Sequence, residues 1–322
     1  MIWAIAKPIL RPYVCRCRPT EGCLVKLIDM RTNKLISLAL LALIAASCSI
    51  KEDRSLCIAP VTVHLNRFTV SQQDYPDTRT TQDLADYNGV NAITLAFYLA
   101  DGTEQYKSTQ LKSDGTTYST FGEFSLSLPM GSYTMVAVAY TTKEESPFTL
   151  TSPVSASYTG AHAYETFVTT QAVDINSTDA VDIGATLSRI ISQLKVVSTD
   201  GKTANVTNVR MTFSAGGRSF NPTTGLATSN AGFENTVGNS AEVGAHSTSS
   251  TVFFLATDEQ TMDVTIETLD ADGNTLFSKT VNDVPFKRNR ITCLTGAMYT
   301  NTGIGGSFLV STDWLTQYNG SF

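Results

Sequence analysis

Apolar and polar residues alternate along most of this chain, from Ala59 to the neighbourhood of Trp314. A repeat of two places every second side chain on one face of an extended strand, whereas an amphipathic helix repeats every three to four residues. The clearest apolar sets, each with polar residues between its members, are Val61, Val63 and Leu65, then Phe124, Leu126 and Leu128, then Val209, Met211 and Phe213, and then Met262, Val264 and Ile266. The pattern predicts an all-β protein built from antiparallel β-sandwiches.

Two further features favour strands. The segment Met135–Tyr140 is apolar at successive positions, so we expect this strand to be covered on both faces. The chain also carries four Asp-Gly pairs, which tolerate positive φ and favour tight hairpin turns. These pairs are Asp101-Gly102, Asp114-Gly115, Asp200-Gly201 and Asp272-Gly273.

The length of 322 residues corresponds to about two domains of ordinary size. One segment, Thr186–Val197, fits a helical apolar spacing as well as an alternating one, but its β-branched residues favour a strand that opens the second domain. The polar stretch Gln171–Gly184 before it is expected to be the junction. We therefore predict one sandwich over residues 59–184 and a second over residues 185–322.

The first 47 residues are expected to be a signal region rather than part of the fold. Leu35–Ala46 is an uncharged run of 12 residues that follows Arg31 and Lys34. A membrane-spanning helix needs about 20 apolar residues, whereas the apolar core of a secretory signal has roughly 7–15. We interpret residues 30–47 as a signal peptide. We expect residues 1–29 to precede the true start codon, with an extended n-region of the signal as the alternative.

A cysteine directly follows the small residues that end this signal. Ala45, Ala46 and Ser47 precede Cys48, and this arrangement resembles the lipobox of bacterial lipoproteins, although Ala45 stands where a Leu is usual. The resemblance implies cleavage after Ser47 and acylation, including palmitate, at Cys48. An ordinary secretory signal that ends near a cysteine is the alternative.

A short charged segment, residues 48–58, joins this cysteine to the first predicted strand. Lys51, Glu52 and Asp53 resemble the signal that routes lipoproteins of the Bacteroidota to the outer face of the outer membrane. The alternative is a solvated tether with no signalling role. Of the other cysteines that follow the signal, Cys57 and Cys293 could form a disulfide in an exported protein, and a buried free thiol at Cys293 is an equal alternative.

Composition excludes several classes of function. The net charge of -6 and the pI near 5.1 argue against nucleic acid as a partner, because phosphates require clustered Lys and Arg. The three histidines, His64, His162 and His246, are scattered, and no zinc-protease, phosphate-loop or nucleophile-elbow motif occurs. We therefore expect neither catalytic residues nor a metal site. We also expect no cofactor and no small-molecule substrate.

Several stretches of the sequence resemble one known family. The stretch from Cys48 to Cys57, Leu187-Ser-Arg189-Ile-Ile, the segment Val284–Gly296 and the late Asp313-Trp314 are together similar to the fimbrillin-associated anchor proteins. These FimB-like proteins are lipidated minor subunits of Bacteroidia-type fimbriae. The resemblance covers nearly the whole chain after the signal. It implies two tandem transthyretin-like β-sandwiches and a role in assembly rather than catalysis.

The same resemblance implies how such a subunit works. An unpaired sheet edge can be completed by an extended strand of a partner, which is called strand complementation. An anchor keeps its first strand, here Ala59–Val70, and offers a donor strand, here Ser307–Trp314 with Phe308, Val310 and Trp314 on one face and Leu315–Phe322 as an extension. The expected partners are fimbrillin stalk subunits and the outer membrane, which the lipid binds.

Two other functions stay open. Arg79 follows the first strand in Asp77-Thr78-Arg79-Thr80, where an arginine-specific protease could cut, and cleavage there would make the protein a stalk or tip fimbrillin. A surface glycan-binding lipoprotein is the other alternative, since Tyr158 and Tyr164 could stack on a sugar ring.

Overall fold

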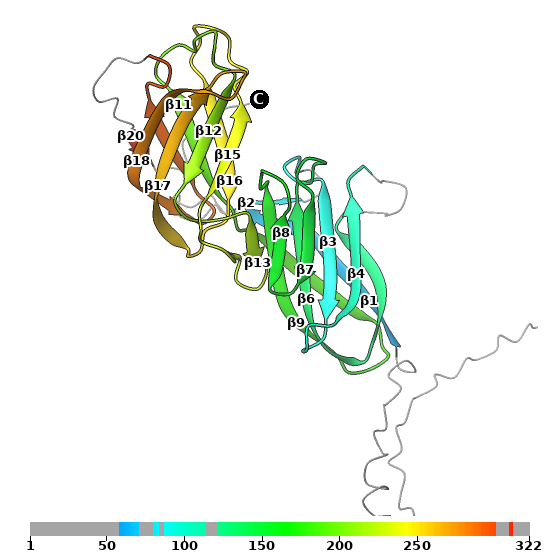
Figure 1. Cartoon of the computed structure of the whole chain (residues 1–322). Helices are drawn as coiled ribbons and strands as arrows, with labels where there is room; N and C mark the ends of the chain where they lie inside the picture. Colours follow the sequence, from blue (N-terminus) through cyan, green and yellow to red (C-terminus); the bar gives the residue numbers. More distant parts are fainter. Residues whose placement is uncertain (1–57, 71–79, 84–86, 114–120, 301–308, 312–322) are drawn as a thin grey trace, which may run out of the picture. The chain divides into compact units, whose positions relative to one another are not determined.

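The computed structural model of the protein describes residues 58–70, 80–83, 87–113, 121–300 and 309–311 (Figure 1). All the regular elements among these residues are strands, which confirms the all-β prediction. Within the described ranges there is accordingly no helix of the length and apolar character needed to cross a membrane.

The first sandwich contains one layer built around β1 (Ile58–Val70). This strand is hydrogen-bonded to β10 (Val181–Arg189), β2 (Thr80–Asp83) and β5 (Glu123–Pro129). β1 and β10 run parallel, whereas β1 and β2 are antiparallel. The first strand of the chain is therefore an interior strand of its sheet.

The second layer of this sandwich is an antiparallel sheet with the order β9-β6-β3-β4. Its strands are β3 (Ala92–Tyr98), β4 (Glu104–Leu111), β6 (Gly131–Tyr140) and β9 (Thr166–Ile175). The two layers join at one corner, where Ser188 and Arg189 of β10 pair with Val168 and Phe167 of β9.

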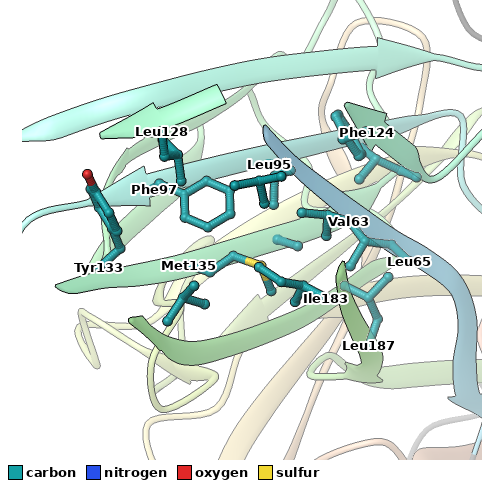
Figure 2. Close-up of a cluster of buried hydrophobic side chains, with 14 of the residues drawn as sticks. Val63, Leu65, Leu95, Phe97, Phe124, Leu128, Tyr133, Met135, Ile183 and Leu187 are labelled. Atoms are coloured by element: carbon teal, nitrogen blue, oxygen red, sulfur yellow. The ribbon is translucent and has the colours of Figure 1, made fainter. Parts of the chain in front are cut away.

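A cluster of buried apolar side chains, the first core, fills the space between these layers. Figure 2 shows side chains from five strands converging there: Val63, Leu65, Leu95, Phe97, Phe124, Leu128, Tyr133, Met135, Ile183 and Leu187. The alternation in β1 and β5 had predicted this arrangement, and it is confirmed except at Leu126, which is only half-buried.

The opposite face of the β9-β6-β3 sheet packs against a second core. A small sheet with the order β14-β13-β8-β7 contributes to it. Its strands are β7 (Phe148–Ser152), β8 (Ser155–Tyr158), β13 (Ser219–Asn221) and β14 (Leu226–Ala227). Val136 and Val138 of β6 are fully buried in the second core, whereas Met135 and Ala137 are buried in the first. The predicted cover on both faces of β6 is thus confirmed.

A second sandwich follows in the chain, with its own third core. One layer has the order β16-β11-β19-β20 and the other has the order β15-β12-β17-β18. The strands are β11 (Ser192–Ser198), β12 (Asn208–Phe213), β15 (Phe233–Gly238), β16 (Thr248–Phe253), β17 (Glu259–Leu269), β18 (Thr275–Lys287), β19 (Ile291–Gly296) and β20 (Leu309–Ser311). The predicted apolar sets in β12 and β17 are buried here, which confirms them.

The two sandwiches repeat one strand order. In each, the first strand runs parallel to a late strand of the same layer: β1 beside β10, and β11 beside β19. The other layer has the order β4-β3-β6-β9 in the first sandwich and β15-β12-β17-β18 in the second. In this shared order β10 of the first sandwich corresponds to β19 of the second, whereas β2 and β20 have no counterpart among the described strands.

The stretch Gln171–Gly184, which the sequence suggested as the junction between the domains, is largely occupied by strands. It contains the end of β9 and the start of β10, both of which belong to the first sandwich. Thr186–Val197 is extended, as predicted, but it holds the end of β10 and most of β11, with Ile190 and Ile191 buried in the second core between them. A division of the chain at residue 184 remains a prediction, and β10 spans that position.

Candidate functional site

The strand nearest the predicted lipid site, β1, is an integral part of the first sandwich. Ala59, Val61, Val63 and Leu65 are at most 1% exposed. Fully burying a Val or Leu side chain stabilises a fold by roughly 1.5–3 kcal/mol. Val61, Val63 and Leu65 together therefore contribute about 4–9 kcal/mol. That is similar to the net stability of a whole domain, about 5–15 kcal/mol. The first sandwich therefore depends on β1.

On the outer face of β1, His64 links neighbouring strands. His64 Nε2 lies 3.1 Å from Asp182 Oδ1 of β10, and His64 Nδ1 lies 3.6 Å from Glu123 Oε1 of β5. These side chains are partly exposed, so each ion pair contributes at most about 1 kcal/mol when His64 is protonated. Burial of the inner face, rather than these contacts, holds β1 in place.

The candidate donor strand pairs within its own chain. Leu309, Val310 and Ser311 form β20, which is antiparallel to β19 and hydrogen-bonded to that strand alone among the described strands. Phe308 and Trp314, which were predicted on the same face as Val310, lie outside the described residues. β20 is thus a three-residue strand at the edge of the second sandwich.

A carboxylate fixes the segment that leads toward β20. Asp200 accepts hydrogen bonds of 2.8 Å from the backbone N–H groups of Met298, Tyr299 and Thr300, and a fourth bond of 2.9 Å from the Thr300 hydroxyl. Burial alone would raise the pKa of Asp200, but these donors outweigh it and lower the pKa below its ordinary value. Asn239 Nδ2 also donates to the Tyr299 hydroxyl at 2.7 Å.

The sequence did not predict the role of the Asp200 carboxylate, because Asp200-Gly201 resembles the other Asp-Gly turns. Asp101-Gly102 and Asp272-Gly273 lie in the β3–β4 and β17–β18 turns, with Gly φ values of 82° and 83°, as predicted. Asp200-Gly201 was predicted as a third hairpin, but Asp200 instead binds backbone about 100 residues away. Its sequence context carries no signal of that contact. Asp114 lies outside the described residues.

A surface pocket of about 500 Å³ is lined by aromatic and charged side chains. Tyr164 donates its hydroxyl to Glu145 Oε1 at 3.1 Å, and Lys143 Nζ lies 4.9 Å from the centre of the Tyr164 ring. Burial raises the pKa of Tyr164 to about 12, and the bond to Glu145 adds to the effect. Burial and the Arg218 charge lower the pKa of His162, which also lines the pocket.

Tyr158, the other predicted sugar-stacking residue, cannot take that role. Its side chain is 4% exposed, and its hydroxyl lies 2.9 Å from Thr166 Oγ1 in the second core. Alternation along β8 places this ring inward, which a sequence window of four residues does not reveal.

Of the residues predicted for the lipid site, the charged segment and the disulfide, only Cys293 lies within the described ranges. Cys293 is half-buried and free, with its Sγ 3.8 Å from Thr295 Oγ1. It lies on the outer face of β19, since Thr292 and Leu294 are the residues that are buried. The remaining predicted residues lie outside the described ranges, and their roles stay predictions: Ser47, Cys48, Lys51, Glu52, Asp53, Cys57 and Arg79.

The motif around Arg189 has a structural explanation. Arg189 is 6% exposed, its Nε lies 2.5 Å from Glu165 Oε1, and its Nη2 donates to the Tyr87 hydroxyl at 2.9 Å. The guanidinium carbon also lies 5.1 Å from the centre of the Phe167 ring. Arg189 thus holds the corner where β9 and β10 meet. Across the described ranges, no three His, Cys, Asp or Glu side chains gather as a metal site would require.

Residues 59–314 match the model of a protein family described as a family of unknown function, DUF6562. A search of curated proteins returns no match.

Several solved structures align with most of this chain at low sequence identity. The fimbrial anchor protein Mfa2 from Porphyromonas gingivalis aligns at 11% identity over 80% of this chain and 98% of its own, with a TM-score of 0.49. A candidate adhesin from Bacteroides ovatus aligns at 12% identity over 79% and 92%, with a TM-score of 0.48. A candidate polysaccharide-binding protein from Bacteroides thetaiotaomicron aligns at 9% identity over 80% and 96%, with a TM-score of 0.47. On the match over residues 59–314, the chain belongs to the DUF6562 family.

Proposed function

We propose that the protein is a lipid-anchored accessory subunit of a surface fimbria, which tethers and terminates the fibre at the outer membrane. The position of β1 is the observation that carries the proposal. β1 begins at Ile58, ten residues after Cys48, and its inner side chains are fully buried in the first core. A lipid at Cys48 would therefore be joined to a core strand through a short charged segment.

Acylation at Cys48 would supply the membrane contact. A single acyl chain binds a membrane only marginally, so stable anchoring requires two or more chains. Diacylglyceryl transfer to the thiol, followed by acylation of the new amine, would meet that requirement. Lys51, Glu52 and Asp53 would then route the protein to the outer surface.

Strand complementation would supply the contact with fimbrillin subunits. β20 has three residues and one strand neighbour among the described strands, so exchanging it for a partner's sheet breaks few hydrogen bonds. In this proposal the segment Ser307–Trp314 leaves β19 and completes a sheet in a stalk subunit. The repeated strand order supports a transthyretin-like identity for each sandwich. No catalytic activity, cofactor or nucleic acid belongs to this role.

The test is lipid labelling of cells with a radioactive fatty acid, combined with mapping of the mature N-terminus. We expect label on the wild-type chain and a mature end at Cys48. Cys48→Ser should lose the label and the membrane association, whereas Cys57→Ser should keep both. Label that persists on the Cys48→Ser chain would refute the proposal.

The stalk or tip alternative makes a different prediction for the same mapping. Arg79 directly precedes β2, so cleavage after it would separate β1 from the rest of the first sandwich. β10, β5 and β2 would lose a shared neighbour, and a partner strand would have to replace it. A mature end at Thr80, abolished by Arg79→Lys, would establish this alternative in place of the anchor.

The pocket around Tyr164 is the observation that favours the glycan-binding alternative. Its lining combines an aromatic ring with Glu145, His162 and hydroxyl groups, a mixture that suits a sugar. Binding of the purified chain to a glycan array, lost in Tyr164→Ala and kept in Val243→Ala, would support it. Val243 is 64% exposed and does not line the pocket.

A further inference from the structure

One edge of the first sandwich, the outer edge of β10, is paired only at its end in the described part of the chain. β10 pairs with β1 along one edge, from Val181 to Ser188. On its other edge it pairs with β9 only at Ser188 and Arg189. The backbone from Val181 to Leu187 therefore has unpaired N–H and C=O groups along that edge, as far as the described strands go.

The equivalent edge in the second sandwich is covered. There β19 occupies the position that β10 holds in the first sandwich, and β20 pairs with its outer edge. Exposed sheet edges are commonly protected by lysine, proline or a bulge, because they invite pairing with another chain. Val181–Leu187 contains no lysine and no proline, and the nearby register shift lies between His64 and Arg67 of β1.

The inner face of this edge is apolar and incompletely covered. Ile183 and Leu187 point into the first core, as Figure 2 shows, so the odd-numbered residues of β10 face inward. Val181 and Ala185 lie on that same face, pack against the first core and remain half-buried. An added strand would cover both side chains.

The sequence of this edge is symmetric about Gly184. The order of apolar and polar residues is the same in both directions along Val181–Leu187. On each side of Gly184 there is an apolar residue, then a polar residue and then a second apolar residue. An antiparallel pair of two such strands centred on Gly184 would place Asp182 opposite Thr186, and Ile183 opposite Ala185. The only charge, Asp182, would then not face its own copy. Gly184 would face Gly184 of the other chain, with open space where a Cβ would stand.

We propose that two copies of this chain dimerise by antiparallel pairing of β10 with β10 across a two-fold axis at Gly184. The contact is self-complementary, as a two-fold interface must be. It would extend the β5-β1-β10 layer of each copy into a continuous sheet of both. The inference does not rest on the proposed fimbrial role. It predicts that each dimer carries two copies of the N-terminal segment, residues 48–58.

Cysteine crosslinking in intact cells tests the register directly. Directly opposite residues of an antiparallel pair have Cα atoms about 4.5–5.5 Å apart, which is within disulfide range. The full-length Gly184→Cys chain should therefore form a disulfide-linked dimer under mild oxidation. Thr186→Cys is the matched control, because two Thr186 positions would lie roughly 13 Å apart, four residues along the strand, and cannot be bridged.

The wild-type chain under the same oxidation shows whether Cys57 or Cys293 contributes any dimer. The same crosslink is expected when Cys48→Ser is combined with Gly184→Cys, so this result and the lipid test stand or fall separately. Absence of a Gly184→Cys dimer, or equal crosslinking by Thr186→Cys, would overturn the proposal.

A second variant tests the dimer without a crosslink. Gly184 has no positive φ and no neighbour where a Cβ would stand, so Gly184→Lys should fold normally, with the circular dichroism spectrum of the wild type. Like charges placed directly opposite one another destabilise a strand pair, and dimerisation of the detergent-purified full chain should weaken by up to about fivefold. Gly184→Ser should leave it unchanged. A wild-type chain that sediments as a monomer at all concentrations would contradict the proposal.

Discussion

At the scale of single residues, the least expected feature is a buried charge at a corner of the first sandwich. The guanidinium of Arg189 forms an ion pair with Glu165 and donates a hydrogen bond to the Tyr87 hydroxyl. The side chain of Arg189 is only 3% exposed. A buried charge is tolerated only when it is paired and hydrogen-bonded. The geometry therefore explains the Leu-Ser-Arg-Ile-Ile motif through structure, with no ligand required.

Removing one partner should show how much the corner depends on this pair. Glu165→Gln leaves Arg189 charged and buried without its carboxylate, so we expect the free energy of unfolding to fall by about 3–5 kcal/mol. Urea denaturation of the purified chain measures it. Glu104→Gln breaks the partly exposed pair with Lys107 (3.3 Å) and should cost at most about 1 kcal/mol. Equal losses for the two variants would disprove this account.

At the scale of elements, the short strand β20 follows a segment that is firmly held. The Asp200 carboxylate binds three successive backbone N–H groups at Met298–Thr300. The backbone is therefore fixed up to Thr300, and the candidate donor strand begins further along the chain, at Ser307.

The lowered pKa of Asp200 makes this attachment depend on pH. The ionised carboxylate stabilises the fold above about pH 4, the ordinary Asp pKa, and this contribution is lost as the pH falls through the lower pKa of the folded state. Asp200→Asn should therefore cost about 1–3 kcal/mol at pH 7 and progressively less as the pH is lowered below about 4. Hydrogen exchange at Met298–Thr300 should accelerate as well.

Asp272→Asn serves as the control, because Asp272 lies exposed in the β17–β18 turn. Its stability should follow the wild type over the same pH range. A pH-independent loss in Asp200→Asn would show that the carboxylate charge is not what holds the segment.

Local sequence patterns predicted where the strands lie better than they predicted which strands and side chains contact one another. Alternation identified β1, β5, β12 and β17, and the Asp-Gly pair at Gly273 located the β17–β18 hairpin, because both signals lie within a few residues. The pairing of β13 with β8 joins residues about 60 apart, and the Arg189 and Asp200 contacts also span long separations. Such contacts depend on the assembled layers, which no sequence window contains.

At the scale of the whole molecule, the second core joins segments from distant parts of the chain. It holds Val136 and Tyr158 together with Phe220 and Phe254, and the latter two are fully buried. β13 pairs with β8 through Phe220 opposite Ala156. The described part of the chain after Ile58 accordingly forms a single compact unit.

A truncation in the second core should reveal this coupling. Phe220→Ala removes a fully buried ring and should lower the free energy of unfolding by about 3–5 kcal/mol. We expect the wild type to unfold in one calorimetric transition and the variant to melt earlier or in two steps. Val243→Ala, at an exposed position, should change neither. Two transitions in the wild type would show that the second core does not couple the sandwiches.

The parallel pairing of β1 with β10, and of β11 with β19, decides how the molecule responds to tension. When the two ends of the chain are pulled apart, β1 is drawn toward its N-terminus while β10 is drawn toward its C-terminus, and the same holds for β11 and β19. Each ladder is then loaded in shear, along its strands, so its hydrogen bonds must break together instead of unzipping one after another. We therefore expect a chain with this connectivity to resist mechanical extension in both sandwiches.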